Sequence, residues 1–244
     1  MHNLGHTRSV NRSDHLLLTP DTFVRTPLPC IEHGAAIVHV SPVNGAAFTQ
    51  YTAELEAGGT LGPTPAQRFV YVLCGEVDLS TDSSFHPLAA GGYAYVPAGL
   101  PHTLTAHNAT RLAVIEKPYQ PLAGAAAPSL LTGNEASVTS TALMNDADLQ
   151  VRALLPDLPA FDFAVNTMTY QPGASLSMVE AHVMEHGLLM LEGGGIYRLG
   201  DAWYPVTAGD FIWMAPFCTQ WFGALGKVAA KYLIYKDCNR HPIG

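Results

Sequence analysis

The chain has 244 residues, of which 48% are hydrophobic and 13% are charged, and its formal net charge at pH 7 is −8. Such a composition is typical of a globular protein with a sizeable core, in one large domain or two small ones, and argues against a disordered chain. The 12 lysines and arginines are scattered along the sequence, which argues against nucleic acid or an anionic membrane as a partner.

The sequence also carries signals about the compartment of the protein. The four cysteines (Cys30, Cys74, Cys218 and Cys238) lie far apart without a CxxC pair, so we expect thiols in a reducing compartment. The N-terminus lacks the apolar core of a signal peptide, and no apolar run approaches the roughly 18 residues that a transmembrane helix needs. We therefore expect a soluble, cytoplasmic protein.

Short strand-like segments recur along the whole chain, with Gly, Pro, Asn and Asp between them. No segment carries a long, capped helical stripe, and residues 145–155 fit a helix or a strand. Many short strands at close spacing predict an all-β barrel or sandwich. The expected strands are 36–40, 47–55, 69–73, 93–96, 110–116, 163–170, 187–191, 211–214 and 231–235.

Residues 121–140 differ in composition from the rest of the chain. They are rich in small residues and proline and show little periodicity, as expected for a connection between domains. We therefore expect an N-terminal lobe over residues 1–124, which includes the N-terminal arm, a linker over residues 125–140, and a C-terminal lobe over residues 141–244.

The two halves of the chain resemble each other. Gly75 and Gly193 each follow an apolar run and are 118 residues apart. Gly91 and Gly209, which open GGYAYVP and GDFIWMAP, are separated by the same number of residues. Two landmarks at one offset, within similar strand-like text, predict a tandem duplication.

Residues 180–187, EAHVMEHG, give the strongest chemical signal. In an extended strand, alternation places Glu180, His182 and His186 on one face, so three potential metal ligands point the same way. A carboxylate with two imidazoles suits a divalent ion such as Mn²⁺, Fe²⁺, Ni²⁺ or Zn²⁺. Solvated polar residues on a barrel strand are the plainer alternative. A helical HExxH zinc motif is another, but no Glu directly follows the first His.

Residues 180–193 and 209–220 resemble the first and second cupin motifs. In this resemblance Glu180 stands for the first His, His182 keeps the second His, and His186 stands for the Glu. Gln220 takes the place of the His in the second motif, and the 118-residue offset relates it to His102. The resemblance implies a bicupin, in which two double-stranded β-helix (jelly-roll) barrels follow in tandem.

The same offset indicates that the N-terminal lobe has no intact metal site. The three ligands of the first motif correspond there to Gly62, Thr64 and Arg68, so His102 remains without partners. A single imidazole would bind a metal weakly. We therefore interpret the N-terminal lobe as structural, and His102 as a strand-end residue that makes a hydrogen bond.

The substituted ligand set narrows the resemblance to the (S)-ureidoglycine aminohydrolase family, bicupin enzymes of allantoin degradation in purine catabolism. The likeness runs from LLLTPDTFVRTPLP near the start to KDCNR near the end and is densest after residue 180. It implies a hydrolase that releases ammonia from a small-molecule substrate, (S)-ureidoglycine, and gives (S)-ureidoglycolate. We expect this hydrolase to be a homo-oligomer.

The resemblance also implies residue roles. The implied Mn²⁺ ligands are Glu180, His182, His186 and Gln220, and the implied substrate-binding residues are Glu180, Tyr197, Gln220, Tyr232 and Lys236. Lys236, Tyr232 and Glu180 are the implied catalytic residues.

Plainer interpretations exist for several of these side chains. Lys236 and Tyr232 are four residues apart and face one side of a strand, but an outward, solvated lysine is the commoner case. Tyrosines are also frequent core residues. We interpret Glu185 as solvent-facing, the three tryptophans as packing residues, and Arg198 and Arg240 as candidate partners of a substrate carboxylate.

Two other classes of function stay open at this point. One is another metal-dependent cupin enzyme, a dioxygenase or an isomerase, although the Glu and Gln ligands argue mildly against iron redox chemistry. The other is a bicupin that binds a small molecule without turning it over.

Overall fold

The computed structural model describes residues 6–240, which form two compact units. The N-terminal unit comprises residues 24–138 and 158–160, and the C-terminal unit comprises residues 6–23, 139–157 and 161–240. Among these residues the helical segments are three short 3₁₀ turns, at Pro20–Thr22, Pro42–Asn44 and Glu135–Ser137. The all-β prediction is confirmed, all nine expected strands are present, and residues 145–155 contain a strand.

The N-terminal unit is built from one bent sheet. Its strand order is β12-β9-β6-β11-β5-β10-β7-β8, and β4 joins it by pairing with β5 and β3. The long strand β5 pairs with β11 and, at its far end, with β10, which curls the sheet toward a barrel. The strands are β3 (Arg25–Thr26), β4 (Ile31–Val40), β5 (Thr49–Leu61), β6 (Gln67–Cys74), β7 (Glu76–Thr81), β8 (Phe85–Ala89), β9 (Gly92–Val96), β10 (His102–Ala106), β11 (Thr110–Lys117) and β12 (Leu131–Asn134).

The C-terminal unit contains two sheets. The larger has the order β1-β2-β19-β16-β21-β15-β14-β13, and the smaller has the order β18-β17-β20. The strands are β1 (Val10–Asn11), β2 (His15–Leu18), β13 (Thr141–Leu143), β14 (Asp146–Ala153), β15 (Ala164–Tyr170), β16 (His186–Glu192), β17 (Gly194–Leu199), β18 (Ala202–Thr207), β19 (Phe211–Met214), β20 (Gln220–Ala224) and β21 (Ala230–Lys236).

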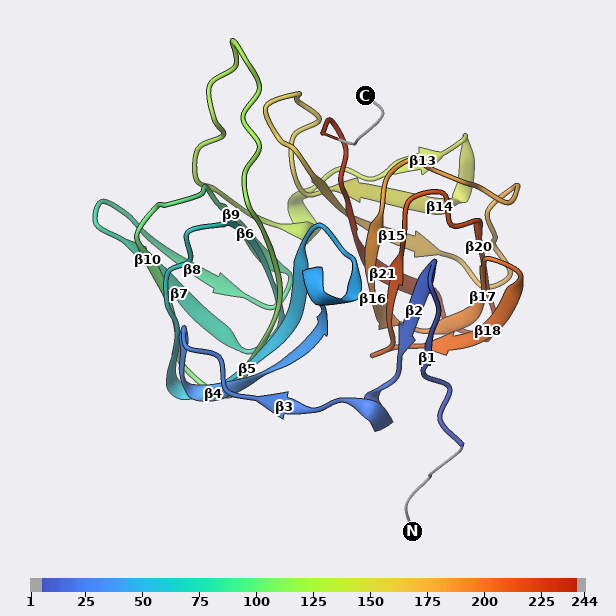
Figure 1. The fold of residues 1–244 in the computed structure, drawn as a ribbon, viewed down its shortest axis with the longest axis horizontal. Coiled ribbons are helices and arrows are strands. Elements are labelled where there is room, and N and C mark those ends of the chain that lie inside the picture. The colour runs from blue at the N-terminus through green and yellow to red at the C-terminus, as the bar shows by residue number, and fades with distance from the viewer. Residues whose placement is uncertain (1–5, 241–244) are drawn as a thin grey trace. The chain divides into compact units, whose positions relative to one another are not determined.

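The N-terminal arm belongs to the C-terminal unit, which corrects its expected place in the N-terminal lobe. Strand β2 pairs antiparallel with β19, from His15 opposite Met214 to Leu18 opposite Phe211. Figure 1 shows β1 and β2 in blue beside the orange and red strands of this unit. The expected linker is also partly ordered, since β12 pairs with β9. Both differences arise because a short segment can pair with any open sheet edge, and the local sequence pattern does not say which edge.

Strand positions bear out the tandem duplication. Strands β7 and β17 are offset by 118 residues at both ends, and so are β10 and β20. The landmark residues Gly75 and Gly193 both have positive φ angles, 85° and 61°, in the tight turns after β6 and β16. Glycine suits this left-handed backbone because it has no Cβ. The repeated glycines therefore mark one turn that occurs in both units.

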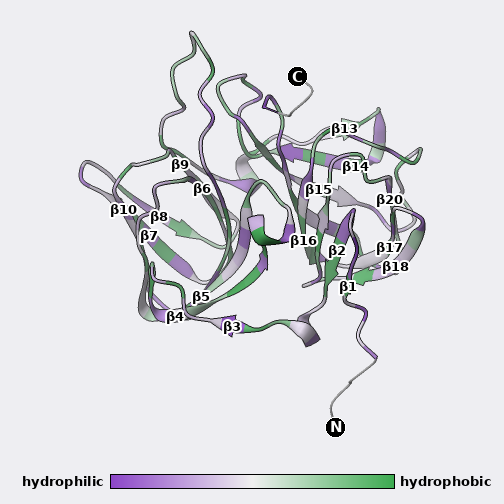
Figure 2. Ribbon diagram, viewed as in Figure 1, coloured by the Kyte–Doolittle hydropathy of each residue, from purple (hydrophilic) through white to green (hydrophobic). Residues whose placement is uncertain are grey.

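Each unit has its own hydrophobic core. Val70, Val72 and Val114 are fully buried in the N-terminal unit, and Leu188 and Ile212 are fully buried in the C-terminal unit. Alternate residues of each strand point into these cores, and Figure 2 shows hydrophobic stretches on strands of both units. Among residues 6–240, no helix has the length and apolar character needed to cross a membrane.

Candidate functional site

A pocket of about 430 Å³ lies in the C-terminal unit. The seven side chains for which the family resemblance implies metal or substrate roles all line it: Glu180, His182, His186, Tyr197, Gln220, Tyr232 and Lys236. Much of the remaining wall is apolar and includes Val151, Met168, Leu176 and Ile234. An apolar cavity with a few convergent polar groups is the usual form of a small-molecule site.

The backbone that carries the first ligands is not the single extended strand that the alternation predicted. Glu180 forms an isolated bridge, residues 183 and 184 form a bend, and β16 begins only at His186. Glu180 and Gln220 are instead joined by two backbone N–H···O hydrogen bonds of 2.8 Å, one in each direction. The three side chains do face one pocket. Pairing between distant segments of the chain brings them there, and the periodicity of a single strand does not.

Three of the candidate ligands lie near one another. Glu180 Oε2 is 3.1 Å from His182 Nε2, and the rings of His182 and His186 meet edge to face with centroids 5.5 Å apart. The ligand atoms of the three do not all lie within 4.8 Å of one another. His182 and Glu180 are partly exposed, so each has access to the pocket solvent.

His186 is the most buried of these ligands, with 3% of its surface exposed. Neither of its ring nitrogens makes a hydrogen bond. Burial lowers the pKa of His186 to about 3, and the charges of Lys236 and His182 act in the same direction, against a weak opposing contact with the Tyr235 backbone. The ring is therefore neutral at physiological pH, and its lone pair is available to a cation.

Gln220 is oriented by Tyr197. The Tyr197 hydroxyl donates a hydrogen bond of 3.1 Å to Oε1 of Gln220, across the paired strands β17 and β20. Burial raises the pKa of Tyr197 well above its ordinary value, so the hydroxyl stays protonated as a donor. Tyr197 therefore contacts a candidate ligand directly.

Tyr170 is a residue that the sequence analysis did not single out. Its hydroxyl lies 2.7 Å from that of Tyr232, and both side chains are buried. Tyr170 ends β15, and Tyr232 lies on the neighbouring strand β21. No local motif marks Tyr170, because its role depends only on the partner across the strand pair.

Lys236 reaches the pocket from the end of β21, the strand that also carries Tyr232, as their spacing predicted. Burial lowers the pKa of Lys236, while the charges of Cys238 and Glu180 raise it. Asn166, on β15, accepts a hydrogen bond of 3.3 Å from Nζ when its amide nitrogen donates to the carbonyl of Val165. A partly desolvated ammonium that faces a pocket favours an anionic ligand.

Proteins of similar sequence share one name. A protein of Arabidopsis thaliana, 41% identical over 242 residues that cover 98% of this chain and 80% of that protein, is named (S)-ureidoglycine aminohydrolase. A protein of Escherichia coli (strain K12) with the same name is 31% identical over 244 residues that cover 97% of this chain and 93% of that protein. This chain belongs to the (S)-ureidoglycine aminohydrolase family.

The folds agree with this family membership. Residues 44–119, within the N-terminal unit, match the EutQ-like cupin domain. The crystal structure of protein Ylba from E. coli has a TM-score of 0.86 and 30% identity to this chain, and the match covers 98% of this chain and 97% of that one. The predicted cupin fold is therefore confirmed.

In this member of the aminohydrolase family, an arginine occupies the N-terminal position that corresponds to His186. Arg68 is fully buried, and its guanidinium lies 2.7 Å from His102 Nε2 and 2.7 Å from Glu116 Oε1. The other ring nitrogen of His102 lies 2.7 Å from the carbonyl oxygen of Leu100, so the predicted hydrogen-bonded strand-end histidine is confirmed. The guanidinium competes with any metal ion for these groups.

Glu185 was expected to face solvent, and this expectation is wrong. It is buried, and its Oε2 accepts a hydrogen bond of 3.0 Å from Nε1 of Trp213. The bend at residues 183 and 184 interrupts the alternation that placed Glu185 outward. Trp213 therefore has a polar role besides packing, whereas Trp203 is largely exposed.

The two candidate arginines do not line the pocket of this family member. Arg198 Nε donates to the carbonyl oxygen of Gly200, and Arg240 Nη1 donates to that of Asn239. Arg198 lies on β17 next to Tyr197, whose side chain lines the pocket, and Arg240 lies beyond the end of β21. Lys236 is thus the one lysine or arginine among the residues that line this pocket.

Proposed function

We propose that this chain is a metal-dependent hydrolase that converts (S)-ureidoglycine to (S)-ureidoglycolate and ammonia. The observation that carries the proposal is His186, whose unpartnered ring nitrogens are buried at a pocket shared with Glu180, Gln220 and Lys236. The names of the two relatives supply the substrate. A pocket that combines metal-ligand side chains with a desolvated lysine favours catalysis over binding alone.

The side chains fit a divalent cation. Imidazole, carboxylate and amide oxygen suit a borderline or hard ion, and the pocket wall includes no cysteine. A buried imidazole without hydrogen bonds is costly unless something binds it. We propose Mn²⁺ as the resident ion, with Glu180, His182, His186 and Gln220 as its ligands. Bound by these residues, the ion would supply a Lewis acid to the pocket.

The remaining groups of the pocket account for the other needs of the reaction. The substrate carries a carboxylate, a ureido group and an amine on one carbon, and water has to replace the amine. Lys236 pairs its ammonium with the carboxylate. Tyr232, held by Tyr170, orients the carboxylate or the water. Glu180 accepts a proton from the water as the carbon–oxygen bond forms, and this proton leaves with the amine as the carbon–nitrogen bond breaks.

The test is ammonia release from freshly generated (S)-ureidoglycine, against a blank without protein because the substrate is unstable. Chelation is expected to abolish the release, and added Mn²⁺ to restore it. His186→Ala should lose both the bound metal, by elemental analysis, and the turnover. His107→Ala, at a half-exposed histidine of the N-terminal unit, is the matched control and should keep both. Ammonia release no faster than the blank, or unchanged metal content in His186→Ala, contradicts the proposal. Oxygen consumption would favour a dioxygenase instead.

We also propose that the protein is a homo-oligomer. Strands β1 and β13 lie at the two ends of the larger sheet of the C-terminal unit, and such edge strands carry backbone groups that can pair with another chain. Light scattering tests this, and the mass of a single chain would contradict it. The cytoplasmic location stays a prediction.

A further inference from the structure

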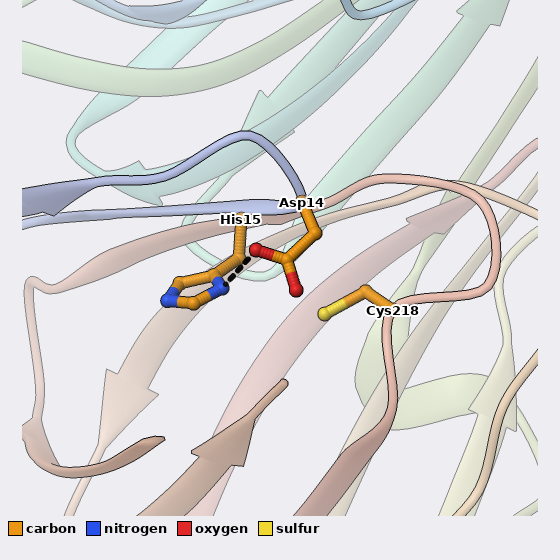
Figure 3. Close-up of side chains that lie close together, drawn as sticks. All are labelled: Asp14, His15 and Cys218. Atoms are coloured by element: carbon orange, nitrogen blue, oxygen red, sulfur yellow. Dashed lines mark hydrogen bonds and ion pairs between the residues drawn. The ribbon is translucent and has the colours of Figure 1, made fainter. Parts of the chain in front are cut away.

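A second group of metal-ligand side chains lies in the C-terminal unit, and none of its members lines the pocket. It consists of the Asp14 carboxylate, the His15 imidazole and the Cys218 thiol, whose candidate ligand atoms all lie within 4.8 Å of one another. Among residues 6–240, this is the one set of three His, Cys, Asp or Glu side chains that meets this limit. Figure 3 shows the Asp14 carboxylate between the ring and the thiol.

Backbone pairing holds the three residues in place. His15 opens β2 and lies opposite Met214, the last residue of β19. The N–H of Ala215 then donates to the carbonyl oxygen of Asp14 at 2.9 Å, and the N–H of Cys218 donates to that of Ala215 at 3.1 Å. The ligand side chains therefore come from a strand pair and the tight turn that follows it. Such a support is more rigid than a free loop.

The ring of His15 already has the surroundings of a metal-bound imidazole. Its Nδ1 lies 2.9 Å from Asp14 Oδ1, and its Nε2 lies 2.9 Å from the hydroxyl of Tyr204. A metal-binding histidine commonly donates its second N–H to an outer partner, which Tyr204 supplies here. Because both nitrogens have partners other than the thiol, His15 is not placed to activate Cys218 as a nucleophile.

We propose that Asp14, His15 and Cys218 form a second divalent-cation site, suited to Zn²⁺. A thiolate with an imidazole favours a softer ion than the oxygen and nitrogen ligands of the pocket do, so the two sites are expected to prefer different metals. Three protein ligands leave a fourth tetrahedral position for water, and Asp14, 46% exposed, opens the site to solvent. Binding releases the thiol proton of Cys218 to solvent, while a neutral His15 keeps its single ring proton on Nε2, toward Tyr204.

An ion at this site joins the N-terminal arm to the turn that leads into β20. Cys218 lies two residues before Gln220, and Asp14 directly precedes β2. Because the three ligands meet only in the folded unit, the ion stabilises the folded state in proportion to its concentration and affinity. Its role is structural, and it takes no part in the hydrolysis.

Co²⁺ distinguishes this site from the pocket because a cobalt–thiolate bond adds a charge-transfer band in the near ultraviolet. Titration of the metal-free full chain with Co²⁺ is expected to produce this band and to saturate it within two equivalents, because the pocket also takes up Co²⁺, and Zn²⁺ should remove it. Cys218→Ser should lack the band. Asp14→Asn replaces a carboxylate ligand by a neutral amide, and Tyr204→Phe removes the outer partner of His15. Each should weaken Co²⁺ binding by about tenfold or more. Circular dichroism establishes that each variant is folded.

Two controls separate the sites. Cys74→Ser, at an exposed cysteine of the N-terminal unit, should keep the band, and so should His186→Ala, which removes a pocket ligand. A band that survives in Cys218→Ser, or that disappears in Cys74→Ser, overturns the second site, and so does the absence of any thiolate band in the unchanged protein. A variant that loses ammonia release but keeps the band has lost the function of the pocket, and the second site is then intact.

Discussion

The hydroxyls of Tyr170 and Tyr232 form a hydrogen bond of 2.7 Å between the neighbouring strands β15 and β21. Tyr232 lines the pocket, whereas Tyr170 does not. Burial raises the pKa of both tyrosines, so the pair is neutral. Tyr170 therefore fixes the direction of a hydroxyl that faces the proposed substrate.

Replacement of Tyr170 by Phe tests this arrangement. The variant removes one hydrogen bond while it keeps the ring, so we expect a loss of stability of about 1 kcal/mol. We also expect kcat for ammonia release to fall by roughly two- to tenfold, which is the same free energy expressed as a rate, with a smaller change in KM.

The matched control is Tyr95→Phe. Tyr95 is equally buried in the N-terminal unit and donates a hydrogen bond of 2.9 Å to Gln67 Oε1. This variant should lose similar stability and keep its kcat. Equal kcat values in Tyr170→Phe and the unchanged protein would show that Tyr232 needs no positioning.

Lys236→Met tests the role of the buried ammonium. Methionine keeps much of the side-chain volume but cannot pair with a carboxylate or move a proton, so turnover should fall by a factor on the order of 10²–10⁴. Elemental analysis should find the metal content unchanged, because Lys236 is not a proposed ligand. Lys231→Met changes the same residue type on the same strand outside the pocket and should retain turnover. A fully active Lys236→Met variant refutes the assigned role.

Arg68→Met tests the internal cation of the N-terminal unit. The substitution leaves Glu116 without the buried guanidinium that pairs with it, which should cost about 3 kcal/mol of unfolding free energy. Arg25→Met breaks the exposed ion pair with Glu54, in which Arg25 is 63% exposed, and should lower the unfolding free energy far less, because solvent screens the pair. Urea unfolding measures both. Equal midpoints for the two variants would show that burial of Arg68 adds nothing.

The burial of His39 predicts that the folded protein loses stability in acid. It is buried on β4 with its Nε2 2.9 Å from the hydroxyl of Thr52, and burial, with a smaller effect of the Arg111 charge, lowers its pKa from 6.5 to about 3. The unfolded chain therefore binds a proton at a pH where the folded chain does not. Stability is fully present above pH 6.5 and is lost as the pH falls toward 3, with a slope of up to about 1.4 kcal/mol per pH unit.

The variant His39→Gln keeps a polar group near Thr52 but cannot titrate. Urea unfolding of both proteins at several pH values between 7.5 and 4.5 should give a shallower loss of stability for the variant, by about 1 to 2 kcal/mol at the acid end. Parallel curves for the two proteins would exclude His39 as the source of the acid sensitivity.

Much of the candidate site was predictable from the sequence because its signals are local or repeated. Glu180, His182 and His186 stand within seven residues, and Tyr232 and Lys236 share one strand face. Gln220 has no local motif, but the 118-residue repeat identifies it by comparison with the other half. In a duplicated sequence, a position in one half can be aligned with its equivalent in the other half, so a distant residue becomes predictable without a structure.

Strand periodicity predicted the nine strands but not the path between them. It made one strand of residues 180–186 and turned Glu185 outward, whereas the chain bends at residues 183 and 184 and Glu185 bonds to Trp213. Alternation assumes a continuous pleat, and a bend of two residues cancels it. The position of Glu180 is set instead by its backbone pairing with Gln220, which sequence periodicity cannot predict.

The sequence by itself determined the all-β class, the duplication and the candidate metal ligands, because hydrophobic alternation, turn residues and repeats are local features of the chain. The roles of Tyr197, Tyr232 and Lys236 were implied by the family resemblance alone. Only the tertiary structure decided where the N-terminal arm pairs, that Tyr170 supports Tyr232, and that Asp14 and His15 meet Cys218. These relationships depend on which strand edges come together, and that choice is made by burial and hydrogen bonding over the whole unit rather than by any local pattern.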